Sequence, residues 1–207
     1  MTAGVLSRSA ALVYHLLVVE LLFLVTAGPG LAVTWLLDPD VSNLPLAALG
    51  MLPAGPALSA ALYALHHRQL DLDDLRPAAL FRRGYRLNLR GALPIWGSWV
   101  LITAFNLAGL SGAGAVVVLM ATLWMLNGLV ITSLFDFRAR DVARLAAYTM
   151  IRTPSVTLAN LCLLVVAVGT VFYFSEIALL LAGSVLMLAL SGNARPLVAL
   201  VRTEFTR

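Results

Sequence analysis

One stretch near the C-terminal end decides the fold: residues 156–190 read VTLANLCLLVVAVGTVFYFSEIALLLAGSVLMLAL. This stretch is almost unbroken apolar sequence, and it is far longer than the roughly 20 residues that cross a bilayer as one helix. The polar pair Ser175-Glu176 lies near its middle, where the chain can turn. We therefore predict two short membrane spans, about 156–174 and 177–191.

The composition of the whole chain also indicates a membrane protein. Of its 207 residues, 61% are hydrophobic and 12% are charged, and the mean hydropathy is +0.94. A typical soluble domain is about half apolar and a quarter charged, and a soluble globule of this size could not bury so much apolar surface. The same composition excludes a disordered chain and a disulfide scaffold. We expect a polytopic helical membrane protein.

Four further spans precede the long apolar stretch, at about 12–37, 44–65, 92–110 and 115–135. Polar or glycine-rich turns end the first and third of them, around Asp38 and Ser111. The six spans pair as three hairpins. The predicted fold is an all-α transmembrane helical bundle, with residues 1–207 as a single integral membrane domain.

The basic residues give the expected orientation of these spans. The chain contains no lysine, and its 14 basic side chains are all arginines. They fall at the N-terminus, in the segments 66–91 and 136–153, and in the tail after residue 193, whereas the opposite loops carry Asp38, Asp40 and Glu176. The positive-inside rule then places both termini and both long loops in the cytoplasm. We expect a multi-pass protein of the bacterial plasma (inner) membrane. The high isoelectric point thus reflects topology, and no nucleic acid is expected as a partner.

Glu20 is the one acidic side chain within the first predicted span. An ionisable group in hydrocarbon costs at least about 2.5 kcal/mol, so it should face a partner or water. It is either a proton, ion or solute site, or a neutral or paired carboxyl group that holds two helices together. Asn106, Asn127 and Asn160 are its candidate partners. His15 lies about 140° away around the helix and is not an obvious one.

Glycine and proline mark candidate helix breaks in the first hairpin. Gly28, Pro29 and Gly30 fall within the first predicted span, and Pro53 and Pro56 within the second. Proline lacks an amide donor, and broken helices can turn carbonyl groups toward a cavity, as in transporters. The favoured alternative is a kink that lets helices pack. Five further glycines indicate close helix approach: Gly109, Gly112, Gly128, Gly169 and Gly183.

The two arginine-rich segments 66–91 and 136–153 are predicted to be amphipathic and cytoplasmic. In the first, Pro77 suits the first position of a helix. Such a helix can lie on the membrane surface, with its aromatic side chains against the bundle and its arginines toward anionic lipid headgroups. The same surface can instead dock a cytoplasmic partner such as an ABC ATPase. We call this surface the 82–90 basic face, and it consists of Arg82, Arg83, Tyr85, Arg86, Asn88 and Arg90.

Two motifs resemble the YesL family of small bacterial integral membrane proteins of unknown function. They are LPAGPALSAALYAL at residues 52–65 and FRRGYRLNLR at residues 81–90. The resemblance implies an accessory role beside sugar ABC transporters, and it implies no reaction. We therefore expect a non-enzymatic accessory component of carbohydrate (ABC-type) uptake. The alternative is a small solute or ion transporter or channel that uses Glu20 and the interrupted first hairpin.

No catalytic, cofactor or metal site is expected from the sequence. The adjacent side chains of His66 and His67 would point about 100° apart on a helix, and no third ligand is evident. The single cysteine, Cys162, lies in an apolar run, so a disulfide is not available.

Overall fold

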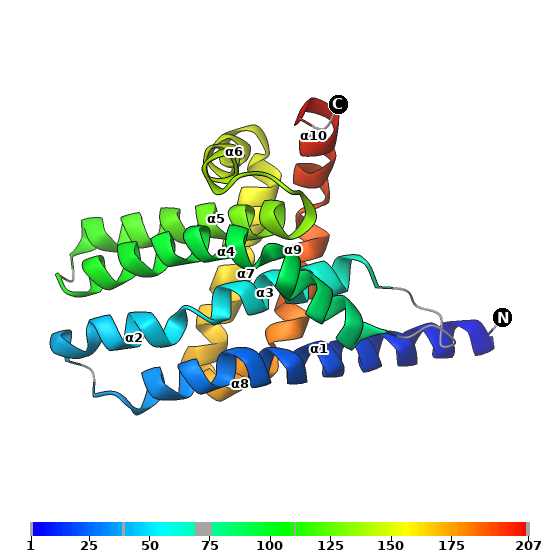
Figure 1. Ribbon diagram of the computed structural model, residues 1–207, viewed down its shortest axis with the longest axis horizontal. Coiled ribbons are helices and arrows are strands. Elements are labelled where there is room, and N and C mark those ends of the chain that lie inside the picture. Colours follow the sequence, from blue (N-terminus) through cyan, green and yellow to red (C-terminus); the bar gives the residue numbers. More distant parts are fainter. Residues whose placement is uncertain (1, 39, 69–75, 110, 206–207) are drawn as a thin grey trace.

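The computed structural model describes residues 2–38, 40–68, 76–109 and 111–205 (Figure 1). The described residues form helices and turns, without a strand, which confirms the all-α class. In chain order the elements are α1 (Thr2–Leu36), the 3₁₀ helix η1 (Val41–Asn43), α2 (Leu44–Met51), α3 (Ala54–His66), α4 (Pro77–Leu107), α5 (Gly112–Leu134), α6 (Ala139–Arg152), α7 (Pro154–Tyr173), α8 (Glu176–Leu181), α9 (Gly183–Asn193) and α10 (Arg195–Phe205).

Four stretches in the described part of the chain are long and apolar enough to cross a membrane: Ser7–Leu36, Val41–His66, Gly112–Leu134 and Pro154–Tyr173. A fifth is obtained if α9 and α10, which meet at an angle of 49°, form one bent span. The predicted third span belongs to α4, in which polar and small residues dilute the apolar ones. The predicted sixth span, 177–191, is divided between α8 and α9. Four or five membrane-length helices are compatible with a membrane protein, and the count of six remains a prediction.

The centre of the structure is α3, which contacts α1, α4, α5 and α9. Almost all of its residues are buried, as is typical of a helix that is apolar all round. Its small residues set the close spacing of its neighbours. A Cβ atom at Gly55 would overlap the side chain of Trp96 on α4, and at Gly84 it would lie 2.8 Å from the Tyr63 side chain of α3.

The helices run in two directions (Figure 1). The helices α1, α3, α4 and α5 follow the long axis of the molecule, and α7 and α9 cross them. α9 contacts both α1 and α3, and α7 contacts α5, α8 and α9. α6 and α10 lie together at the top of Figure 1.

The candidate break at Gly28, Pro29 and Gly30 does not occur, because α1 is helical through all three residues. Proline removes one backbone hydrogen bond of the helix. In an apolar environment each further unpaired backbone group costs several kcal/mol, which favours keeping the remaining hydrogen bonds. Gly30 serves close packing instead. A Cβ atom at this position would overlap the carbonyl oxygen of Gly50 in α2. The hydroxyl group of Thr34 donates to the Gly30 carbonyl at 3.1 Å and to the Ala47 carbonyl at 3.3 Å, which links the two helices further.

In the second predicted span, the two prolines behave differently. The helix breaks at Pro53, because α2 ends at Met51 and α3 begins at Ala54. The indole Nε1 of Trp96 donates to the Met51 carbonyl at 2.8 Å and so satisfies a carbonyl near the break. Pro56 lies in the first turn of α3, where an amide donor has no partner within the helix, and it does not break the helix.

Candidate functional site

Glu20 lies on the buried side of α1, and its carboxylate contacts the start of α9. The side chain is 7% exposed, and its Oε2 accepts a hydrogen bond from the backbone amide of Ser184 at 2.5 Å. Ser184 lies in the first turn of α9, where amide groups lack partners within the helix. The preceding Gly183 makes room, since a Cβ atom there would lie 3.1 Å from Oε1 of Glu20. The carboxylate therefore caps α9, and its Oε1 is buried without a partner.

The three residues of the predicted intramembrane polar site take different partners. Asn127 on α5 accepts from Nδ2 of Asn160 on α7 at 3.2 Å and donates to the hydroxyl group of Thr149 on α6 at 3.5 Å. Asn106 donates to the carbonyl of Ile102 in its own helix at 2.8 Å. The buried asparagines thus connect α5, α6 and α7, whereas Glu20 connects α1 and α9.

His15 is fully buried on α1, one helical turn before the next buried residue of the same face, Val19. Its Nδ1 lies 3.2 Å from the carbonyl oxygen of Ala11, and its Nε2 is buried without a partner. Neither nitrogen contacts Glu20, in agreement with the separation of the two side chains around the helix that the sequence indicated.

An apolar groove of about 1160 Å³ lies between α2, α4 and α5. Asn106 is the polar side chain among residues that are otherwise apolar or small, such as Leu101, Phe105 and Met120. Because this groove contains almost no hydrogen-bonding groups, it suits a hydrocarbon chain better than a polar solute.

The 82–90 basic face lies on the first part of α4. Its arginines are exposed, Tyr85 is half-buried and Asn88 is buried, with Phe81 and Ala92 buried beside it. As expected for an amphipathic helix, the arginines face outward and the aromatic residues face the bundle. The Nδ2 of Asn88 donates to the Ser133 carbonyl of α5 at 3.5 Å.

The expectation of a separate surface helix before the third span is wrong. The helix begins at Pro77 as predicted, but it continues through Gly91 and Pro94 to Leu107 as one element. Gly91 marks a close contact with the Thr132 side chain, at 2.8 Å for an added Cβ atom, rather than a helix end. The parts of the predicted segment at 69–75 and of the predicted third span at residue 110 lie outside the described residues.

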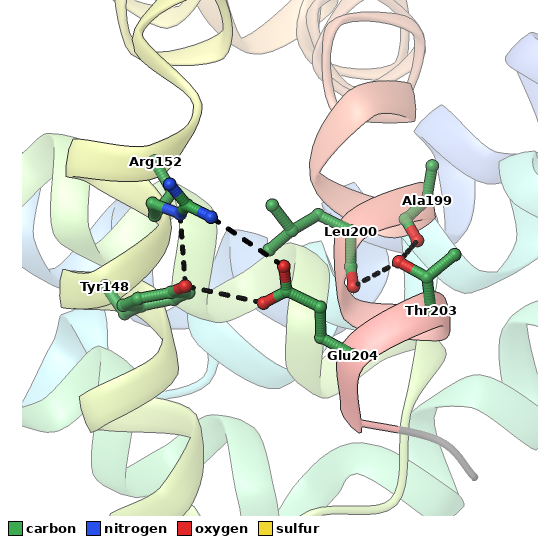
Figure 2. Close-up of polar contacts among 6 residues, drawn as sticks. All are labelled: Tyr148, Arg152, Ala199, Leu200, Thr203 and Glu204. Carbon is green, nitrogen blue, oxygen red and sulfur yellow. Dashed lines mark hydrogen bonds and ion pairs between the residues drawn. The ribbon is translucent and has the colours of Figure 1, made fainter.

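The second predicted amphipathic segment forms α6. Its inner face buries Val142, Leu145, Ala146 and Thr149. Figure 2 shows its outer contacts with α10: the hydroxyl group of Tyr148 donates to Glu204 at 3.4 Å, and Nη2 of Arg152 lies 4.0 Å from the other oxygen of the same carboxylate. These exposed contacts dock α10 on α6.

Among the described residues, no group of three or more His, Cys, Asp or Glu side chains is placed to hold a metal ion. The ring of His67 lies on Tyr63, with 4.2 Å between ring centroids, and its Nδ1 is 3.0 Å from the Tyr63 carbonyl oxygen. Cys162 is exposed on α7.

No family model, curated protein or solved structure gives a significant match to this chain. The resemblance to the YesL family therefore rests on the two sequence motifs, and the accessory role that it implies remains an expectation.

Two features of the site were not predicted from the sequence. The partner of Glu20 is the backbone amide of Ser184. Every residue type except proline carries such an amide, so the sequence does not indicate which one is the partner. The second feature is a cluster of cationic side chains where α3 ends near α9 and α10. Its members are far apart in the sequence, although Arg195 and Arg202 are spaced to share one helix face.

Proposed function

We propose that the protein is a six-span protein of the bacterial plasma membrane with both termini in the cytoplasm. In this proposal it is a non-enzymatic accessory subunit that docks a partner through the 82–90 basic face. An ABC-type carbohydrate uptake complex is the expected partner, and the YesL resemblance supplies that setting.

The six crossings in this proposal are α1, α2–α3, the second part of α4, α5, α7 and α8–α9. The distribution of the arginines over the helix ends supports it. The N-terminus lies at the right of Figure 1, and α6 and α10 lie at the top. The α1–α2 and α4–α5 turns lie at the left and α8 at the bottom. Along the sequence, the arginines fall in the segments on one side of these proposed crossings, whereas Asp40 and Glu176 fall in the loops on the other side.

The observation that carries the accessory role is the use of Glu20 in a helix contact. The carboxylate binds the Ser184 amide in a buried position, and the apolar groove and the cationic cluster lie elsewhere in the described structure. A transport path would need polar groups that line a water-filled cavity. One exposed polar surface is the guanidinium array of the 82–90 basic face, and planar guanidinium groups suit carboxylates on a partner.

Cross-linking in native membranes, followed by purification of the tagged protein, tests the docking. Wild-type protein should capture ABC transporter subunits, and a variant with Arg82→Gln, Arg83→Gln and Arg86→Gln should lose them. The matched control removes the same charge from α6, with Arg138→Gln, Arg140→Gln and Arg144→Gln. Absence of ABC subunits, or equal loss in both variants, would contradict the proposal.

Cysteine labelling tests the topology independently. In a Cys162→Ala background, a Ser42→Cys variant should react with an impermeant maleimide in intact cells. A Thr203→Cys variant should react only after the membrane is permeabilised.

The alternative function, a small transporter or channel, predicts that proteoliposomes of the purified protein carry a solute or ion flux. Glu20→Gln would abolish that flux.

A further inference from the structure

A cavity of about 680 Å³ lies where the end of α3 meets the bend between α9 and α10. Its polar groups come from His66, Arg68, Ser191, Arg195 and Arg202. The volume falls within the range of about 300–1,000 Å³ that is usual for sites of small ligands. This cavity shares no residue with the 82–90 basic face.

The local structure explains why the arginines meet. Arg195 and Arg202 are seven positions apart on α10, so they lie on the same face of the helix. The 49° bend between α9 and α10 turns that face toward the end of α3. Arg68 follows α3 directly, and its Nη1 donates to the Leu65 carbonyl at the last turn of that helix. The cation therefore lies at the negative end of the α3 dipole.

None of the described residues that line this cavity is acidic. Burial, and to a smaller extent the positive charge of Arg195, lower the pKa of the Arg68 guanidinium. Its Nε is buried without a hydrogen-bond partner. The positive charge of Arg195 close to Arg68 and the unpaired buried Nε of Arg68 are both unfavourable. A bound anion with several acceptor oxygens would offset both.

We propose that this cavity binds the phosphate group of an anionic phospholipid, such as phosphatidylglycerol, from the cytoplasmic leaflet. Guanidinium groups bind phosphate through paired hydrogen bonds, and basic pockets between helices at the cytoplasmic side of a membrane are suited to anionic headgroups. The remaining wall of the cavity is apolar, from Leu188, Val198 and Ala199, which suits the start of an acyl chain better than a free anion. The assignment rests on the cytoplasmic orientation proposed above.

The test measures lipid binding to the full-length protein in detergent by native mass spectrometry. The ligands are phosphatidylglycerol, phosphatidylcholine with the same acyl chains, and inorganic phosphate. The variant is Arg68→Gln with Arg195→Gln. The matched control, Arg138→Gln with Arg140→Gln, removes the same charge from exposed positions at the start of α6. A second variant, Arg195→Lys, keeps the charge but loses the planar donor pair, and it covers the case in which the double variant does not fold.

We expect phosphatidylglycerol to bind wild-type protein and the control within about twofold of each other. Binding to the double variant should weaken by about tenfold or more, and binding to Arg195→Lys by a smaller factor, as expected for the loss of charge-assisted hydrogen bonds. Equal weakening in the control would overturn the proposal in favour of general charge attraction. Equal binding of phosphatidylcholine would overturn it as well.

Inorganic phosphate that binds as tightly as phosphatidylglycerol would overturn the lipid assignment and identify a soluble phosphate ligand. Because lipid binding in detergent depends on neither orientation nor a protein partner, its failure is distinct from that of the proposed function. Cysteine labelling and partner capture report on the latter.

Discussion

The carboxylate of Glu20 and the backbone amide of Ser184 are hydrogen-bonded at 2.5 Å, although the two residues are 164 positions apart. An acidic group in a membrane helix needs a partner, and the first turn of a helix offers both a free amide donor and a favourable dipole. Glu20 on α1 and the start of α9 therefore satisfy each other. This contact joins the first helix of the chain to the last hairpin.

Replacement of Glu20 by alanine should lower the stability of the protein by about 1–3 kcal/mol, because the buried Ser184 amide loses its acceptor. Glu20→Gln should cost less, since the side-chain carbonyl still accepts the hydrogen bond. Thermal unfolding in detergent measures both effects. The control is Glu176→Ala, the same change at an exposed position. A stability of Glu20→Ala equal to that of wild type would show that the contact does not hold the two helices.

Gly55 should not tolerate a side chain, because a Cβ atom there would overlap the Trp96 side chain. We expect Gly55→Ala to destabilise the protein by about 1–3 kcal/mol through overpacking. The shift should also disturb the hydrogen bond from Trp96 to the Met51 carbonyl and change the tryptophan fluorescence. Thermal unfolding and emission spectra measure these changes.

Gly28 provides the matched control for Gly55. Nothing lies within 4 Å of a Cβ atom at this helical position. Gly28→Ala should therefore leave stability unchanged or raise it by up to about 1 kcal/mol, because alanine favours the helix. If the two variants behaved alike, close packing of α3 against α4 would not be the cause of either effect.

Long apolar runs predicted the helices best. The predicted spans 12–37, 115–135 and 156–174 correspond to α1, α5 and α7, whose ends lie within a few residues except at the N-terminus of α1. The sequence could not predict the continuity of α4. The change from arginines to apolar residues after Arg90 indicates a change of environment along α4. It does not end the helix, which continues to Leu107.

The candidate sites depended more on tertiary packing than on residue type. The outward arginines and the buried Phe81, Asn88 and Ala92 of α4 follow from helical periodicity, so their exposure and burial were predictable. The partner of Glu20 was not, because a search among polar side chains cannot find a backbone amide. Close approach was predicted correctly for Gly128, which faces the Ile95 side chain, and for Gly183, which faces the Glu20 carboxylate. It was wrong for Gly109, Gly112 and Gly169, because nothing lies within 4 Å of a Cβ atom at these positions. Residue type alone does not predict such a contact. A Cβ atom at Gly30 would overlap the Gly50 carbonyl, whereas nothing lies within 4 Å of a Cβ atom at Gly28, two positions earlier.

The asparagine pair of α5 and α7 should contribute through a direct interaction. Asn127 and Asn160 are each 1% exposed and are joined at 3.2 Å. A double-mutant cycle of Asn127→Ala and Asn160→Ala, measured by unfolding in detergent, should give a coupling energy of about 0.6–1.7 kcal/mol. In the control cycle, Asn106→Ala replaces Asn127→Ala, because Asn106 bonds only within α4. A coupling near zero in the first cycle would contradict the pairing.

The contacts between α6 and α10 should be weak and sensitive to salt. Glu204 lies 4.0 Å from the guanidinium group of Arg152, and the two side chains are 39% and 58% exposed (Figure 2). Exposed pairs of this kind contribute about 0–1 kcal/mol and are screened by salt. We expect Glu204→Gln to lower the midpoint of thermal unfolding slightly at low salt and not at about 1 M salt, where the Debye length is only about 3 Å.

The control variant, Phe205→Ala, removes instead the apolar contact with Tyr148, whose ring centroid lies 6.0 Å away. Because burial of apolar surface is not screened, its effect should persist at high salt. A large, salt-independent loss in Glu204→Gln would mean that the carboxylate holds α10 through something other than the ion pair.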